Sequence, residues 1–382
     1  MELEKRLTAL DPSVGADAGR SKHFCTDNSI TEMTGNSKEF DDFQREMFRR
    51  MQPSYLETVS LSELYDNVYQ RRPALVEGLL HRGAYLLVGA PKIGKSFLTA
   101  QLAYHVSTGT PLWGFPVKQG TVLHLALEDD YGRLQERLYR MYGVVENEKL
   151  RFSVSAKQLG KGLDEQLEGF VKEYKDTSLI IIDTLQKIRE MAGDAYSYAS
   201  DYQIITRLKN FADEHGICIL VVHHTRRQRA EDSYDMISGT NGLFGAADGA
   251  ILLQKVKRTA NIATLEISGR DQQDQKLYLL RNEVSLCWEL DHVETDLWKA
   301  PPEPLLDMIA GIITEVKPEW TGTPTELCEL LKMNTKPNAL SRKLNVNAGR
   351  LREEYGIQYW SRHVHGPRQI GFRYQGRDDV RR

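Results

Sequence analysis

Cysteine is scarce in this 382-residue sequence, and its distribution excludes two kinds of stabilisation. The four cysteines lie far apart and form no C-x-x-C pair, so we expect neither a disulfide framework nor a cysteine zinc site. A reducing, cytoplasmic environment fits this pattern. No apolar run is long enough to span a bilayer, and the charged start MELEKRLTALDPS lacks the apolar centre of a signal peptide. We therefore expect no membrane partner.

The charge is nearly balanced overall but unevenly distributed. The formal net charge is −3, with 41% hydrophobic and 27% charged residues, which is ordinary for a globular chain. The span Lys336–Arg377, however, holds nine basic and two acidic residues. This asymmetry predicts that the C-terminal part meets a polyanion.

The middle of the chain alternates between apolar runs and amphipathic stretches. Residues 1–50 are polar and are predicted to be mostly disordered, with a short helix at Phe40–Met51. From about Leu79, near-continuous apolar strands alternate with helical patterns, which predicts an α/β fold with a mainly parallel sheet covered on both faces. After Lys255 the runs IATLEIS, KLYLLR and SLCWELD indicate antiparallel strands that extend the sheet. The first six predicted strands are Ala84–Gly89, Thr121–Leu127, Arg151–Ser155, Ser178–Asp183, Cys218–His224 and Ala250–Lys255.

A proline-rich segment marks the predicted domain boundary. Trp298–Leu305 holds three prolines in eight residues, so we expect one domain over 51–300 and another over 301–382. The second would contain three helices followed by a basic hairpin, an order that resembles a winged helix. Its predicted parts are Leu305–Val316, Thr325–Met333, Asn338–Glu354 and the hairpin Tyr359–Tyr374.

The strongest motif is G-x-x-x-x-G-K-S, placed between a predicted strand and a predicted helix. Its glycines let backbone N–H groups surround phosphates, and the helix N-terminus favours negative charge. Lys95 would neutralise the β- and γ-phosphates of ATP, and the Ser96 hydroxyl would bind Mg²⁺. The predicted nucleotide-binding residues are Gly89, Ala90, Pro91, Lys92, Ile93, Gly94, Lys95 and Ser96.

Polar residues end three of the other predicted strands. Asp183 closes LIIID and would hold Mg²⁺, although a helix cap is the alternative interpretation. Glu128, in LALEDD, closes another strand, and a solvated acidic loop is its alternative. His223 and His224 close VVHH, where a donor could sense the γ-phosphate. We favour His224 over a structural role for both histidines.

Together these motifs resemble the RepA-like hexameric replicative helicases, plasmid-borne members of the RecA–DnaB superfamily. The resemblance spans about Ala74 to Asn282 and rests on GAPKIGKS, LALEDD, LIIIDTLQ and VVHHTRR, with weaker support from GTNGLFGAADGAILL and ISGRDQQDQKLYLL. It implies that Glu128 orients the attacking water. It also implies a homo-oligomeric ring in which a neighbouring subunit supplies an arginine finger. Arg270 aligns with that finger, but the lysine of the family's K-x-R motif is absent here, and Arg258 is the competing candidate.

DNA is the partner that this resemblance implies. Loops at Lys187–Asp201 and Arg226–Asn241 would face the ring centre, and Arg226, Arg227 and Arg229 would contact single-stranded DNA; a solvated basic loop is the alternative. The winged helix would contact duplex DNA or, alternatively, protein. Its predicted contacts are Arg342, Lys343, Arg350, Arg352, Arg362 and Arg368.

The predicted function is that of an ATP-dependent DNA helicase or translocase in the replication of a plasmid, integrated element or phage. Two alternatives stay open. One is a DNA-binding regulatory ATPase without unwinding activity. The other is an assembly protein in which bound nucleotide merely orders the oligomer.

Overall fold

The computed structural model describes residues 45, 47–69, 73–189, 198–224, 241–255, 257, 260–270, 272–294, 301–362 and 368–376. The chain divides into two units, Met1–Leu61 and Ser62–Arg382. In the first, residues 47–51 are helical, which agrees with the end of the helix predicted at Phe40–Met51. The disorder predicted for residues 1–50 falls mostly outside the described residues.

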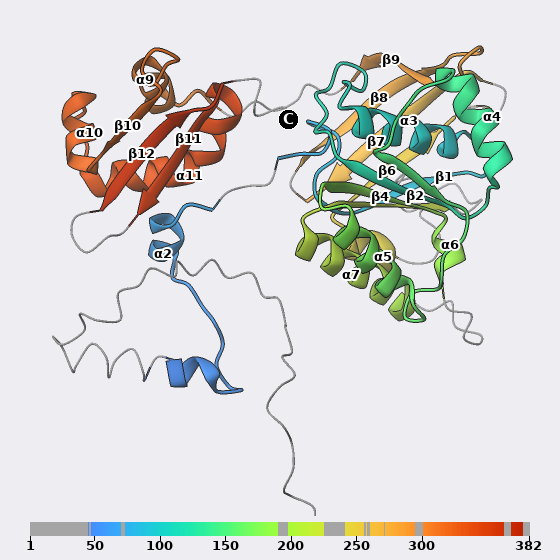
Figure 1. Ribbon diagram of the computed structural model, residues 1–382, viewed down its shortest axis with the longest axis horizontal. Helices are drawn as coiled ribbons and strands as arrows, with labels where there is room; N and C mark the ends of the chain where they lie inside the picture. The colour runs from blue at the N-terminus through green and yellow to red at the C-terminus, as the bar shows by residue number, and fades with distance from the viewer. Residues whose placement is uncertain are drawn as a thin grey trace, which may run out of the picture. The chain divides into compact units, whose positions relative to one another are not determined.

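A nine-stranded sheet forms the centre of the second unit (Figure 1). Six strands run parallel, and the last three continue the sheet antiparallel, as the sequence predicts. A mainly parallel α/β fold is therefore confirmed. In spatial order the strands are β3 (Leu150–Ser153), β2 (Thr121–Ala126), β4 (Thr177–Asp183), β5 (Cys218–His224), β1 (Gly83–Gly89), β6 (Gly249–Gln254), β7 (Ile262–Gly269), β8 (Gln272–Arg281) and β9 (Trp288–Val293).

Helices cover both faces of this sheet. Figure 1 shows α3 on one face and α5 and α7 on the other. Because strand side chains alternate between faces, successive residues of β4 join different cores: Leu179 packs on the α3 side and Ile180 on the α5–α7 side. The helices of this part are α3 (Lys95–Thr108), α4 (Tyr131–Tyr142), α5 (Leu163–Glu173), α6 (Leu185–Ile188), α7 (Tyr198–His215) and α8 (Asn241–Ala246).

The C-terminal part has a hydrophobic core of its own. Three helices and a three-stranded antiparallel sheet of order β10-β12-β11 enclose it. The short strand β10 was not predicted from the sequence. Thr323 starts α10 with a capping box in which Thr323 and Glu326 each satisfy the other's backbone N–H. The elements are α9 (Pro304–Ile312), β10 (Glu319–Gly322), α10 (Pro324–Leu330), α11 (Pro337–Tyr355), β11 (Ile357–Arg362) and β12 (Gln369–Tyr374), and a short helix near the N-terminus, α2, spans Leu61–Asp66.

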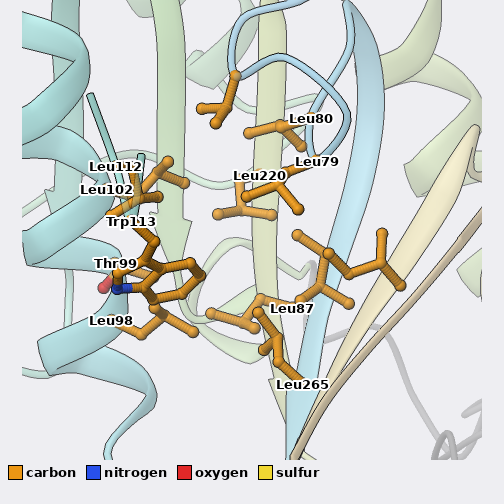
Figure 2. Close-up of a pocket in the computed structure, with 13 residues that line it drawn as sticks. Leu79, Leu80, Leu87, Leu98, Thr99, Leu102, Leu112, Trp113, Leu220 and Leu265 are labelled. Atoms are coloured by element: carbon orange, nitrogen blue, oxygen red, sulfur yellow. The ribbon is translucent and has the colours of Figure 1, made fainter. Parts of the chain in front are cut away.

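A small apolar cavity of about 30 Å³ lies between α3 and the sheet (Figure 2). Leu98 and Leu102 approach it from α3, and Trp113 and Leu265 line it from elsewhere. The Thr99 hydroxyl also borders it and is satisfied by the Ser96 carbonyl at 3.2 Å. A cavity of this size and lining belongs to the hydrophobic core and offers no polar group to orient a ligand.

None of the helices in the described ranges combines the length and apolar character that crossing a membrane requires.

His124 is a buried titratable group in the middle of β2. It is 1% exposed, and neither ring nitrogen has a hydrogen-bond partner among the described residues. Its ring packs against Phe152 of the adjacent strand, with centroids 5.4 Å apart. Burial, reinforced by the charge of Arg137, lowers the pKa of His124 to about 4. The folded protein therefore holds this imidazole neutral.

We predict that His124 makes the fold acid-sensitive. The unfolded chain protonates this histidine near pH 6.5 and the folded chain only near pH 4, so its contribution to stability is complete above pH 6.5 and is lost as pH falls through that window. From these two pKa values, the free energy of unfolding should fall by about 2 kcal/mol between pH 7 and pH 5 because of His124. The His124→Leu variant should lack this part of the pH dependence in chemical denaturation. Identical pH slopes for the two proteins would refute the assignment.

Candidate functional site

The predicted phosphate loop connects β1 to α3. Gly94 precedes the helix with a φ of 109°, a backbone conformation that residues other than glycine rarely adopt. A Cβ at Gly89 would lie 2.6 Å from the Leu253 carbonyl oxygen, so only glycine fits where β1 ends. No described side chain caps the first turn of α3. Its backbone N–H groups are thus available to phosphate oxygens.

The Lys95 ammonium lies folded over this loop. Its Nζ donates to the carbonyl oxygens of Gly89 at 2.7 Å and Ala90 at 3.0 Å. Burial lowers the pKa of Lys95 to about 8, while the carboxylates of Asp183 and Glu128 oppose that shift. A partly buried cation between two carboxylates, at a helix N-terminus, is suited to a polyanionic ligand.

Ser96 and Asp183 form the candidate magnesium site. The Ser96 hydroxyl donates to Asp183 Oδ2 at 2.9 Å, which joins the first turn of α3 to the end of β4. Asp183 is 6% exposed. Burial raises the pKa of its carboxyl, whereas the hydrogen bond from Ser96 lowers it, and the net shift is upward. The described residues contain no group of three or more His, Cys, Asp or Glu side chains that could hold a metal. A hydroxyl and one carboxylate suit Mg²⁺, which keeps water and phosphate oxygens as its other ligands.

Glu128 is held beside this pair by Thr184. The Thr184 hydroxyl donates to Glu128 Oε1 at 3.1 Å, so the residue after Asp183 orients the candidate base. Thr184 precedes α6, yet its side chain forms no cap there, since it is turned toward Glu128. This role of Thr184 was not predicted from the sequence.

The three acids of LALEDD have different surroundings. Asp129 pairs with Arg137 at 2.6 Å, and Asp130 caps α4 by accepting from the Arg133 N–H at 2.9 Å. Glu128 alone of the three accepts from Thr184 in the described contacts. The geometry thus separates one acid near the phosphate loop from two that stabilise α4.

His224 ends β5 directly beside the phosphate loop. It is paired in register with Gly89, and its Nδ1 lies 3.1 Å from Lys95 Nζ. Burial, followed by the Lys95 charge, lowers the pKa of His224, so the ring is neutral near pH 7. The preceding residue, His223, is 9% exposed. Of the two histidines, His224 is therefore the one placed against the nucleotide-binding residues.

The predicted arginine finger lies on the surface. Arg270 forms the turn between β7 and β8, and its guanidinium donates to the Gly245 carbonyl oxygen at 3.1 Å. The side chain is exposed and could be reached by another molecule. The competitor Arg258 lies outside the described residues. So do Arg226, Arg227 and Arg229, together with most of the two loops predicted to face single-stranded DNA.

Most of the basic residues predicted to bind duplex DNA have carboxylate partners. Lys343 pairs with Glu303 at 2.8 Å, and Arg350 pairs with Glu354 at 2.6 Å. Arg350 is half-buried rather than fully exposed. Arg352 and Arg362 are exposed, and the Arg362 guanidinium lies 5.2 Å from the Trp360 ring centroid.

Asp66, which the sequence did not single out, binds the other two arginines. Its carboxylate accepts two hydrogen bonds from Arg342, at 3.0 and 3.1 Å, and Arg368 donates to the Asp66 carbonyl oxygen. Next to them the Asn345 amide donates to the Tyr65 carbonyl oxygen at 2.9 Å. The hydrogen bonds from Arg342 hold the pKa of Asp66 below its usual value. The end of α2 is thus attached to α11 by a two-pronged ion pair.

Comparison with known proteins finds one family model and several solved structures that are similar to this chain. Residues 51–230 match a family model described as an AAA domain. No curated protein sequence matches the chain at a significant level. A solved structure described as an ATPase domain has a TM-score of 0.45 and 16% identity, and the match covers 67% of this chain and 98% of that one. Another, described as a DnaB-like replicative helicase and its interactions with primase, has a TM-score of 0.48 and 15% identity, covering 66% and 71% respectively.

The strand order brings the phosphate loop close to the two strands that lead to acidic residues. Strand β5 lies between β1, which precedes the phosphate loop, and β4, which ends in Asp183. Strand β2, which leads to Glu128, pairs with the other side of β4. Residues 51–230, which contain the phosphate loop and the strands that end near it, are thus similar to an AAA domain.

Proposed function

We propose that this protein is an ATP-dependent DNA helicase or translocase that acts as a homo-oligomeric ring. The observation that carries the proposal is the convergence of Lys95, Ser96, Asp183 and Glu128 at one edge of the sheet. The resemblance of the motifs to plasmid-borne replicative helicases supports a role in replicating a plasmid, integrated element or phage.

Each group at this edge has a role in ATP hydrolysis under the proposal. The N–H groups of residues 89–96 and the Lys95 ammonium bind the phosphates. Mg²⁺, held by Ser96 and Asp183 when bound, supplies charge stabilisation at the transferred phosphoryl group. Glu128, oriented by Thr184, accepts a proton from the attacking water, and His224 senses the γ-phosphate. Arg270 of a neighbouring subunit completes the site.

We further propose that residues 51–300 form the ATPase domain and residues 301–382 a winged-helix domain that binds duplex DNA. The separate hydrophobic core and separate sheet of the C-terminal part support this division. Three helices followed by a β-hairpin, with Arg352 on the last helix and Arg362 on the hairpin, support the DNA-binding role.

Unwinding is the test of the proposed function. The protein should displace a strand from a tailed duplex when ATP and Mg²⁺ are present, and the Lys95→Ala variant should not. Measurable phosphate release without strand displacement would favour a regulatory ATPase instead. Absence of phosphate release would favour a nucleotide-ordered assembly protein.

Replacing Glu128 by glutamine should leave ATP bound and stop turnover, because an amide does not accept a proton from water. General-base catalysis typically contributes about 10²–10⁴-fold, so phosphate release should fall by at least about 100-fold. The matched control is Asp129→Asn, since Asp129 is the adjacent acid but pairs with Arg137. If Glu128→Gln hydrolyses ATP at the normal rate, the base is another residue.

Removing the two exposed arginines of the C-terminal part should weaken duplex binding at low salt. Each lost phosphate contact should reduce the magnitude of the slope of log affinity against log salt by about 1. The slope of the Arg352→Ala, Arg362→Ala double variant should therefore be smaller in magnitude than the wild-type slope by about 2. The control removes two exposed lysines of the ATPase domain, Lys149 and Lys172. Equal affinities and slopes for the double variant and the wild type would instead indicate a protein-contact module.

A further inference from the structure

Trp288, at the start of β9, lies against the phosphate loop. Its side chain is fully buried, and its indole Nε1 donates to the Gly94 carbonyl oxygen at 3.3 Å. A Cβ at position 94 would lie 2.9 Å from the ring carbon Cζ2, so the indole occupies the space that a side chain at position 94 would need. The Gly94 carbonyl also accepts the Leu98 N–H at 3.1 Å, the first hydrogen bond of α3. One carbonyl thus joins α3 to the antiparallel part of the sheet.

Gln101 fixes the backbone of Trp288 to α3. The Gln101 amide donates to the Trp288 carbonyl oxygen and accepts from the Trp288 N–H, both at 2.8 Å. Because β9 is the last strand of the sheet, the outward peptide groups at its start need partners other than a strand. Gln101 is 4% exposed, so these two bonds are shielded from water. The ammonium of Lys255 lies 5.2 Å from the indole centroid and adds a cation–π contact.

We propose that Trp288 is a positioning residue for the phosphate loop and that Gln101 holds it in place. The Gly94 carbonyl and the Lys95 N–H belong to one planar peptide group, so a donor that fixes the carbonyl also fixes the direction of that N–H. Gly94, with its φ of 109°, has no side chain to restrict this peptide by itself. The indole therefore orients an N–H group at the N-terminus of α3, where phosphate oxygens bind.

This inference rests on nucleotide binding by the ATPase domain and assigns the site a residue that no phosphate-loop motif contains. A purely structural tryptophan is the competing explanation. The two differ in what they predict at equal stability. A positioning residue changes nucleotide affinity beyond any loss of stability, whereas a core residue changes affinity only as the fold weakens.

Trp113 provides a matched control. Its Nε1 donates to the same Trp288 carbonyl oxygen, at 2.7 Å, so Trp113 also anchors the start of β9. Its ring, however, lines the apolar cavity between α3 and the sheet (Figure 2). Trp113→Phe removes one indole N–H from the strand anchor and keeps both Gln101 bonds. Trp288→Phe removes the donor to Gly94 and shrinks the ring beside it.

The experiment compares full-length wild type, Trp288→Phe, Trp113→Phe and Gln101→Met. The probes are a fluorescent ATP analogue for affinity, phosphate release for KM and kcat, and the thermal unfolding midpoint for stability. Loss of one hydrogen bond at a binding loop should weaken analogue binding by Trp288→Phe about three- to tenfold. Gln101→Met should shift affinity in the same direction. The affinity of Trp113→Phe for the analogue should stay within about twofold of the wild-type value, even if its unfolding midpoint falls as far as that of Trp288→Phe.

Two results would overturn the proposal. One is wild-type affinity in Trp288→Phe, and the other is an affinity loss that Trp113→Phe shows equally at the same unfolding midpoint. Analogue binding does not require hydrolysis. If the wild type binds the analogue but releases no phosphate, the proposed function fails while the affinity comparison still decides the role of Trp288.

Discussion

Parallel pairing of β1, β5, β4 and β2 is the constraint on which the nucleotide site depends. Register places Gly89 opposite His224, and Ala126 opposite Asp183, so all four strands end at the same edge of the sheet. The side chains that follow these ends therefore meet although long stretches of chain separate them. Ser96 and Asp183 are 87 positions apart and hydrogen-bonded. A slip of one residue in this register would reverse the face of every side chain on the slipped strand and separate the groups.

One cation, Lys95, lies among the carboxylates at this edge. Lys95 lies near two carboxylates, and the burial that lowers its pKa to about 8 also raises the pKa of Asp183. In a partly dry environment such a cluster interacts strongly with added charge. An incoming phosphate would draw Lys95 away from the carbonyl oxygens of Gly89 and Ala90, which hold it now. The loop already has the ammonium within reach of its ligand.

Much of this site follows from local sequence, and the remainder follows from packing. The phosphate loop, the Asp183 strand and the VVHH strand have patterns that are complete within a few residues, so the α/β class and the proximity of Lys95, Ser96 and Asp183 could be predicted. Thr184 could not be assigned to Glu128 in advance, because that contact depends on how β2 and β4 end beside each other. Trp288 meets Gly94 across 194 positions, only through the path of three antiparallel strands. Asp66 is 276 positions from Arg342, and no local pattern links them.

The ion pair between Asp66 and Arg342 makes the basic face of α11 a site that already contains an anion. A phosphate that approaches Arg342 competes with a carboxylate of the same chain, and because this competitor is tethered, dilution of the protein does not weaken it. The pair is solvent-exposed, so added salt screens it as well as the phosphate contact. Salt thus frees the arginine while it weakens the arginine's hold on any polyanion, and the two effects oppose each other.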